Sequence, residues 1–130
     1  MDSFGRNEIH NAILDYNENQ HYTLIERLIS NGIDPNLQDN NGWSPLHFAC
    51  QENSEQAVLA LIKNKVLIDL KDQFGNTPLF KAVFSSKGQG NIIKLLLEAG
   101  ANANSVNKNG VSPQTLASSI GNYNVHQFFI

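Results

Sequence analysis

Short apolar runs alternate with polar, glycine-containing stretches along most of the chain, and the apolar runs come in pairs. The second run of a pair reads EQAVLALIKN over residues 55–64 and NIIKLLLEAG over residues 91–100. Both place apolar residues at the spacing of an amphipathic helix. The first run of a pair is shorter and begins at a proline, as in PLHFAC from Pro45. The pattern therefore predicts a turn, a helix, a second turn and a second helix in each pair.

The first runs and the turns before them are copies of one another. NGWSPLHFAC begins at Asn41, FGNTPLFKAV at Phe74 and NGVSPQTLAS at Asn109. The prolines of the first two copies are 33 residues apart and those of the last two are 35 apart. We place the two extra residues in SSKGQG, residues 85–90. A fixed period of this length is typical of a solenoid of stacked units.

The residues at both ends of the predicted helices fit this interpretation. Ser44, Thr77 and Ser112 each precede a proline, so each is placed to cap a first helix whose N1 residue is that proline. Most second helices end near a glycine, which adopts the left-handed conformation freely. Lys65 occupies this position after the second helix of residues 55–64, so we expect Asn64 to be the left-handed residue there.

These motifs carry a resemblance to a known family. GWSPLHFA from Gly42 and GNTPLFKA from Gly75 resemble the ankyrin repeat, a 33-residue unit with the signature TPLHxA. NGIDPNLQD and AGANANSVN resemble its hairpin stretch between units. The resemblance implies an all-α ankyrin-repeat solenoid of helix-turn-helix units joined by β-hairpin-like loops. We assign residues 1–130 to a single domain, with unit 1 at 6–38, unit 2 at 39–71, unit 3 at 72–106 and unit 4 at 107–130.

The terminal units depart from the motif, as expected for the ends of a stack, where each unit has one neighbour. Unit 1 lacks the SP start and has four extra residues near DYNENQHY, residues 15–22. We interpret it as an N-terminal capping repeat. Unit 4 has Gln114 where units 2 and 3 have leucine, and the sequence ends at Ile130. We interpret it as a truncated C-terminal capping repeat.

Charge and hydropathy exclude several classes of partner. The formal net charge is −3, and the nine Lys and Arg residues are too scattered to follow a phosphate backbone. No apolar run reaches the length of a membrane span, and MDSFGRNEIH lacks the basic start and apolar core of a signal peptide. We therefore expect a cytoplasmic protein that binds neither nucleic acid nor membrane.

The residues that commonly carry chemistry have structural interpretations here. The lone Cys50 excludes an intramolecular disulfide and a cysteine metal cluster, and we interpret it as a small buried hydrophobe. The resemblance implies that His47 bonds to backbone and links neighbouring units, and the aligned His10 is interpreted as packing too. His21, in a presumed loop, and His126, in the last helix, lack the spacing of a zinc site.

Asp39 and Asp72 begin hairpin turns, where a carboxylate accepts local backbone N–H bonds. We therefore predict no catalytic residue, no metal and no cofactor, and a protein that is not an enzyme. An enzyme remains the third alternative, in which His47 would be required for activity.

The resemblance implies binding of a protein partner through the hairpin tips and the exposed side of the first helices. Carried over position by position, it selects these residues: Asn40, Asn41, Trp43, Gln51, Glu52, Gln73, Phe74, Asn76, Phe84, Lys108 and Val111. An aromatic side chain at a turn is unusual unless something covers it. Trp43 and Phe74 therefore either contact the partner or pack on each other. For Phe84 we expect packing against the lengthened loop.

Two functions follow from this face. The first is a non-catalytic interaction module, monomeric when free. The alternative is an immunity or inhibitor protein that neutralises a cognate toxin or effector enzyme by direct binding.

Overall fold

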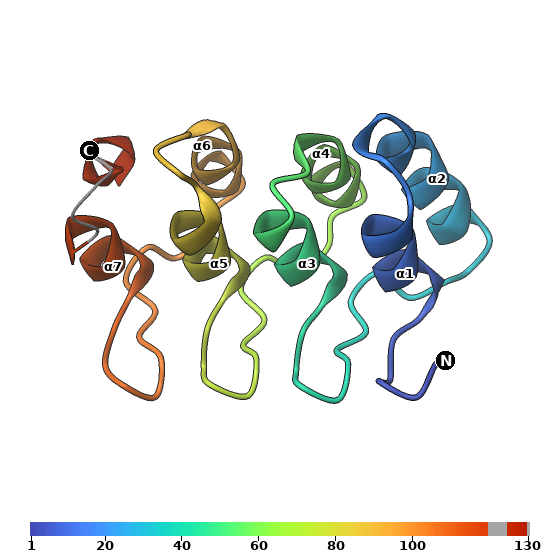
Figure 1. Ribbon diagram of the computed structural model, residues 1–130, viewed down its shortest axis with the longest axis horizontal. Helices are drawn as coiled ribbons and strands as arrows, with labels where there is room; N and C mark the ends of the chain where they lie inside the picture. Colours follow the sequence, from blue (N-terminus) through green and yellow to red (C-terminus); the bar gives the residue numbers. More distant parts are fainter. Residues whose placement is uncertain (120–124, 130) are drawn as a thin grey trace.

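The helices come in consecutive pairs that stack into a row, in a computed structural model that describes residues 1–119 and 125–129 (Figure 1). The elements in chain order are α1 (Glu8–Asp15), α2 (Glu18–Ser30), α3 (Pro45–Gln51), α4 (Glu55–Lys63), α5 (Pro78–Ser85), α6 (Asn91–Glu98), α7 (Pro113–Ser119) and the 3-10 helix η1 (His126–Phe129). None of these described residues lies in a β-strand. The predicted all-α solenoid of paired helices is confirmed.

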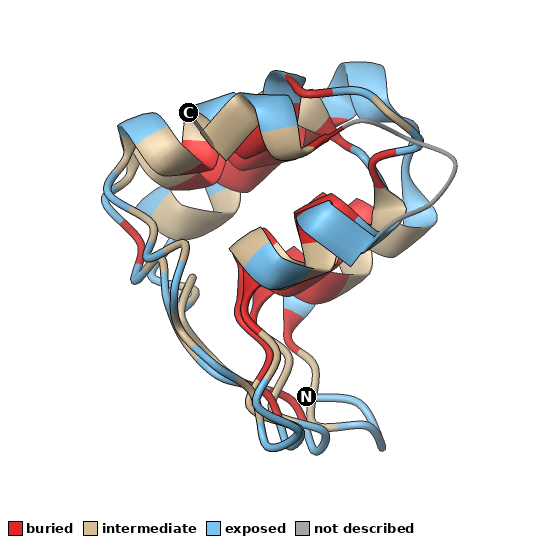
Figure 2. Ribbon diagram, turned by 90° about the vertical axis from the view of Figure 1, so that its left-hand side faces the viewer, coloured by how far each residue is buried: buried red, intermediate tan, exposed pale blue. Residues whose placement is uncertain are grey.

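The stack has two layers of helices and a row of hairpin-like loops. Helices α1, α3, α5 and α7 form one layer, α2, α4 and α6 form the other, and the loops project on one side (Figure 1). In the first layer α3 packs on α1 and α5, and in the second α4 packs on α2 and α6. Figure 2 shows buried residues where the two layers face each other. Leu46, Leu61, Leu79 and Leu96 are among the fully buried side chains of this core.

The predicted N-caps are confirmed. The side-chain oxygens of Ser44, Thr77 and Ser112 each accept a hydrogen bond from the backbone N–H three residues on, at 3.4, 3.4 and 3.1 Å respectively. The proline that follows each cap opens its helix, where a missing N–H leaves no bond unmade. The three caps fix where α3, α5 and α7 begin.

The end of α4 differs from the prediction. Asn64 has φ −88°, and its side-chain amide donates to the carbonyl of Ala60 at 2.7 Å. Lys65 instead adopts the left-handed conformation, with φ 58°, at the position of the glycines after α2 and α6. The prediction for Asn64 is therefore wrong. The Asn64 side chain satisfies a terminal carbonyl within the helix, and Lys65 bears a cost of about 1 kcal/mol.

The inserted residues lie in different places in units 1 and 3. The α5–α6 loop spans residues 86–90 and the α3–α4 loop spans 52–54, which confirms the extra pair of residues. Only residues 16 and 17 separate α1 from α2, and α2 has 13 residues where α4 has 9. The insertion thus lengthens α2 by about one turn. The prediction that His21 lies in a loop is wrong, because His21 belongs to this added turn.

Candidate protein-binding face

Each hairpin tip is a turn held by its own first side chain. Asp39 Oδ1 accepts from the backbone N–H groups of Asn41 and Trp43 at 2.9 and 2.8 Å. The equivalent oxygens of Asp72 and Asn107 accept in the same way in units 3 and 4. These bonds fix the direction of the side chains at each tip, as predicted for Asp39 and Asp72.

Neighbouring tips are joined by backbone hydrogen bonds. The N–H of Gln73 donates to the carbonyl of Asn41 at 3.0 Å, and that of Lys108 donates to Phe74 at 2.9 Å. Gly42 allows this approach: a Cβ there would lie 2.8 Å from the Asp72 Cα, and its φ is +81°. The tips therefore form a continuous, ordered row.

The row begins with a tip that lies before the predicted start of unit 1. Asp2 Oδ1 accepts from the N–H groups of Phe4 and Arg6 at 2.9 and 3.0 Å. The N–H of Asn40 donates to the Phe4 carbonyl at 2.9 Å, so this tip joins the next one. Asp2 and Gly5 have the same spacing as the Asp or Asn and the Gly of the other tips, and this spacing is the signal that would have revealed the first tip.

Two buried histidines tie the tips to the first helices. His47 Nδ1 accepts from the backbone N–H of Ser44 at 3.0 Å, so Nε2 carries the proton and donates to the Asn76 carbonyl at 2.9 Å. His10 makes the same bonds to Asn7 and to the Trp43 carbonyl. Burial is the main reason that the pKa of His47 falls to about 4, and it lowers the pKa of His10 too.

His21 and Cys50 are also committed to packing. His21 Nε2 donates to the Tyr16 carbonyl, and Nδ1 accepts from the Ser54 hydroxyl, both at 2.6 Å. Cys50 is fully buried, and burial raises the pKa of its thiol, which keeps the sulfur protonated. Within the described residues, no three His, Cys, Asp or Glu side chains are grouped so that they could hold a metal ion.

Two cation-containing clusters lie between the tips and the first helices. Lys81 Nζ is 3.8 Å from Asp72 Oδ2 and 4.2 Å from the centre of the Trp43 ring. Arg6 Nε is 3.6 Å from Asp39 Oδ2, and the Arg6 guanidinium lies 4.9 Å from the centre of the Phe48 ring. Burial lowers the pKa of Lys81, while Asp72 acts in the opposite direction. Sequence reasoning missed Arg6 and Lys81, because the aromatic partner of each, and the Asp39 partner of Arg6, belong to a neighbouring unit.

Most of the residues selected from the sequence are exposed. Figure 2 shows the loops extending away from the helix layers, so the tips and the first helices enclose an angle. We call the surface lining this angle the tip–helix face. Its exposed members are Asn40, Asn41, Gln51, Glu52, Gln73, Phe74, Phe84 and Lys108, and the half-buried Trp43 and Val111 adjoin them.

Asn76 is the exception. It is buried, its carbonyl accepts from His47, and its side-chain oxygen accepts from the Asn107 amide at 2.9 Å. The expectation that Asn76 contacts a partner is therefore wrong, because both of its oxygens are used to join units 2, 3 and 4.

The three aromatic candidates differ in their surroundings. Trp43 packs within unit 2, with its ring centre 4.7 Å from that of Phe48 and 6.0 Å from that of His47. Phe74 is 57% exposed and Phe84 is 71% exposed. The expectation that Phe84 packs against the long loop is therefore wrong. The alternative in which Trp43 and Phe74 cover each other is not what the structure shows, because the Trp43 ring contacts Phe48, His47 and Lys81, and Phe74 faces solvent.

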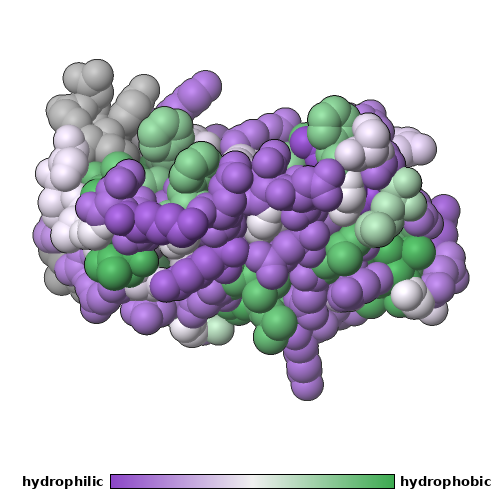
Figure 3. All heavy atoms as spheres, turned by 90° about the horizontal axis from the view of Figure 1, so that it is seen from below, coloured by the Kyte–Doolittle hydropathy of each residue, from purple (hydrophilic) through white to green (hydrophobic). Residues whose placement is uncertain are grey.

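The remaining surface on this side is mainly polar. Figure 3 shows mostly hydrophilic residues there, interrupted by separate hydrophobic patches. No helix in the described part of the chain is long and apolar enough to cross a membrane.

A stack of paired helices with His-linked hairpin loops defines a repeat solenoid, and comparison with known proteins identifies its family. A family model described as ankyrin repeats in three copies matches residues 9–107. The chain belongs to the ankyrin-repeat family, whose domains are generally protein–protein interaction modules and typically non-catalytic.

Several known proteins contain similar segments. The chain is 41% identical over 78 residues to potassium channel SKOR of Arabidopsis thaliana, which covers 58% of this chain and 9% of the channel. It is 39% identical over 97 residues to human SMC5-SMC6 complex localization factor protein 1, and the match covers 74% of this chain and 9% of that protein. It is 31% identical over 117 residues to ankyrin repeat protein OPG189 of variola virus, and the match covers 87% of this chain and 21% of the viral protein. The similarity thus spans a small part of each relative.

Proposed function

We propose that the protein binds another protein through the tip–helix face. The observation that carries this proposal is the exposure of Phe74 and Phe84, on the tip and on the first helix of the same unit. Large apolar side chains in water favour burial against a partner, and aromatic residues are enriched in protein interfaces.

The surface around these residues suits a protein partner. The other exposed residues selected from the sequence are mainly amides, such as Asn41, Gln51 and Gln73, with one carboxylate at Glu52 and one ammonium at Lys108. A polar rim around an apolar centre is the usual composition of a non-obligate protein interface.

The face is also held in place before a partner arrives. Adjacent tips share backbone hydrogen bonds, and the Trp43 ring is fixed between Phe48 and the Lys81 ammonium. A preorganised surface loses little conformational entropy on binding, so more of the contact energy appears as affinity.

The first test is capture of partners from native lysate with the wild type and with a Phe74→Ala/Phe84→Ala variant. A captured protein is then purified, and its affinity for both forms is measured by calorimetry. We expect the double substitution to weaken binding by tenfold or more, roughly the effect of losing one interface hot spot. Leu67→Ala removes an equally exposed apolar side chain that follows α4, and serves as the matched control.

Circular dichroism must show that all three forms are folded. Equal affinity of the double variant and the wild type would refute binding through Phe74 and Phe84. The enzymatic activity of a captured partner, measured with and without this protein, separates an inhibitor from an adaptor.

A further inference from the structure

One flank of unit 1 has the composition of a surface between two units. In unit 2 the side chains of Ala57 and Leu61 are fully buried, and α4, which carries them, packs on α2. One 33-residue period earlier, 57 − 33 and 61 − 33, the same positions are Leu24 and Leu28 on α2. These two leucines are only half-buried, because their flank of the stack packs against no other described unit. We call this surface the unit 1 flank.

The unit 1 flank is hollowed as well as apolar. A groove of about 310 Å³ lies between α1 and α2 and is lined in part by Ala12, Leu24 and Leu28. A second hollow of about 370 Å³ adjoins it and shares Tyr16 and Leu24 with it. Tyr16 is 53% exposed at this boundary. The flank therefore has shape and apolar area with which another surface can interlock.

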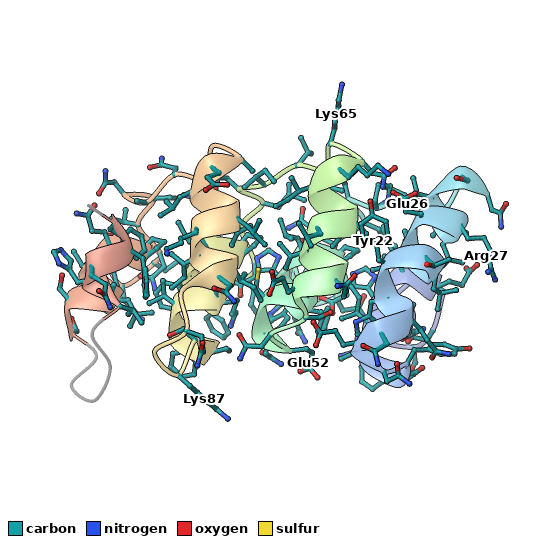
Figure 4. All side chains as sticks on the ribbon, turned by 90° about the horizontal axis from the view of Figure 1, so that it is seen from above. Tyr22, Glu26, Arg27, Glu52, Lys65 and Lys87 are labelled. Atoms are coloured by element: carbon teal, nitrogen blue, oxygen red, sulfur yellow. The ribbon has the colours of Figure 1, made fainter. Side chains whose placement is uncertain are left out.

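Opposite charges lie on the two sides of this apolar centre. Glu8 and Asp15 line the groove on the α1 side, whereas Arg27 lines the second hollow on α2. Figure 4 shows Arg27 pointing away from α4, while Tyr22 and Glu26 on the same helix point toward it. Within the described part of the chain, the side chains of Glu8, Asp15 and Arg27 form none of the ion pairs, which join other residues.

We propose that the unit 1 flank binds a second copy of this chain and forms a two-fold symmetric dimer. A two-fold axis through the apolar centre at Tyr16 and Leu24 places Glu8 and Asp15 of one copy opposite Arg27 of the other, and repeats the pairing on the other side. Burial of the leucines and the tyrosine supplies the affinity, and the two charge pairs set the orientation. This dimer departs from the free monomer expected from the sequence.

The dimer is independent of partner binding through the tip–helix face. Phe74 and Phe84 belong to unit 3, away from the unit 1 flank, so both copies keep them exposed. Two linked faces bind a bivalent partner or a surface-bound array more tightly than one face does.

The test uses sedimentation velocity on the purified chain at concentrations up to about 500 µM, since a small interface gives a weak dimer. Wild type should shift from monomer to dimer as its concentration rises. Arg27→Glu places a carboxylate opposite the acidic side chains of α1, and Asp15→Lys places a lysine opposite Arg27. Each variant alone should dimerise about tenfold more weakly or worse, because like charges then face each other.

In an equimolar mixture of Arg27→Glu and Asp15→Lys, the mixed dimer again places opposite charges at positions 15 and 27 on both sides, and we expect it to dimerise about tenfold more tightly than either variant alone. Glu98→Lys changes an exposed charge in α6 and should leave dimerisation unchanged. A wild type that stays monomeric throughout overturns the proposal. So does a dimer that survives either charge reversal, or a mixture in which dimerisation is not restored.

Discussion

At the scale of single residues, two histidines in successive units make the same pair of hydrogen bonds. His10 and His47 each accept from the backbone N–H of their N-cap residue and donate to the carbonyl of a residue in the next unit. Both rings are fully buried and must remain neutral to make these bonds. Protonation therefore competes directly with the links between units.

This arrangement predicts that acid weakens the fold before the carboxylates titrate. The pKa of His47 is about 4 in the folded chain and about 6.5 when unfolded, so the unfolded state binds the proton more readily. The stability is fully present above pH 6.5 and is lost progressively as the pH falls toward 4. The loss from His47 amounts to roughly 3 kcal/mol, and His10 adds to it in the same direction.

Urea unfolding at several pH values between 7.5 and 4 measures this loss. His47→Gln retains an N3 side chain that can reach back to the cap but does not titrate, so its stability should depend less on pH. His10→Gln/His47→Gln should give the flattest profile. A His47→Gln profile as steep as that of wild type would contradict the prediction.

At the scale of helices, the caps determine where an element begins, and their strength can be tested separately. Thr77 Oγ1 accepts from the Phe80 N–H, and Thr77 itself is buried between units. Thr77→Ala should lower the free energy of unfolding by about 1 kcal/mol, because α5 loses an N-cap bond. Thr23→Ala, at an exposed position within α2, is the control and should change stability little. Equal stability of the Thr77 variant and wild type would place the start of α5 elsewhere.

Features that depend on local chemistry were predictable from the sequence. Helices α3, α5 and α7 begin at a Ser/Thr-Pro pair, and two of the turns begin at Asp39 and Asp72. Both features depend on contacts within about five residues, so the local sequence specifies them. The 33-residue period then fixed which helices are neighbours.

Features that depend on contacts between units could not be predicted from the sequence. The sequence suggests that Asn76 is an exposed tip residue, but in the structure it accepts hydrogen bonds from Asn107 and His47, which belong to other units. Lys81 reads as a solvent-exposed lysine, although it lies against the Trp43 ring of the preceding unit. For Phe84 the opposite holds, because the ring is exposed where we expected it to pack against the longer α5–α6 loop. A single sequence shows the register of a repeat more clearly than the orientation of each side chain.

At the scale of the whole molecule, stability should vary along the stack. Each unit contacts only its neighbours, so a unit with two neighbours is held by two interfaces and a terminal unit by one. Helices α3 to α5 have packed helices on both sides, and α6 has α4 on one side and the Phe128 ring of η1 near Lys94 on the other, whereas α1 and α2 have packed helices on one side only. The stack is therefore expected to open from its ends.

Hydrogen exchange of backbone amides, followed by mass spectrometry at low protein concentration, tests this gradient. We expect the slowest exchange in α3 to α6 and faster exchange in α1, α7 and η1, because opening an end unit breaks a single interface. The long α2 should exchange more slowly than α1, since it packs extensively on α4 and is tied to it by the Lys63–Glu26 pair at 3.2 Å. Uniform protection along the chain would mean that the stack opens as one cooperative unit.

If the proposed dimer forms, raising the protein concentration should slow exchange in α1 and α2 and leave exchange in α5 to α7 unchanged. This dependence on concentration separates the effect of the dimer from the gradient of the monomer.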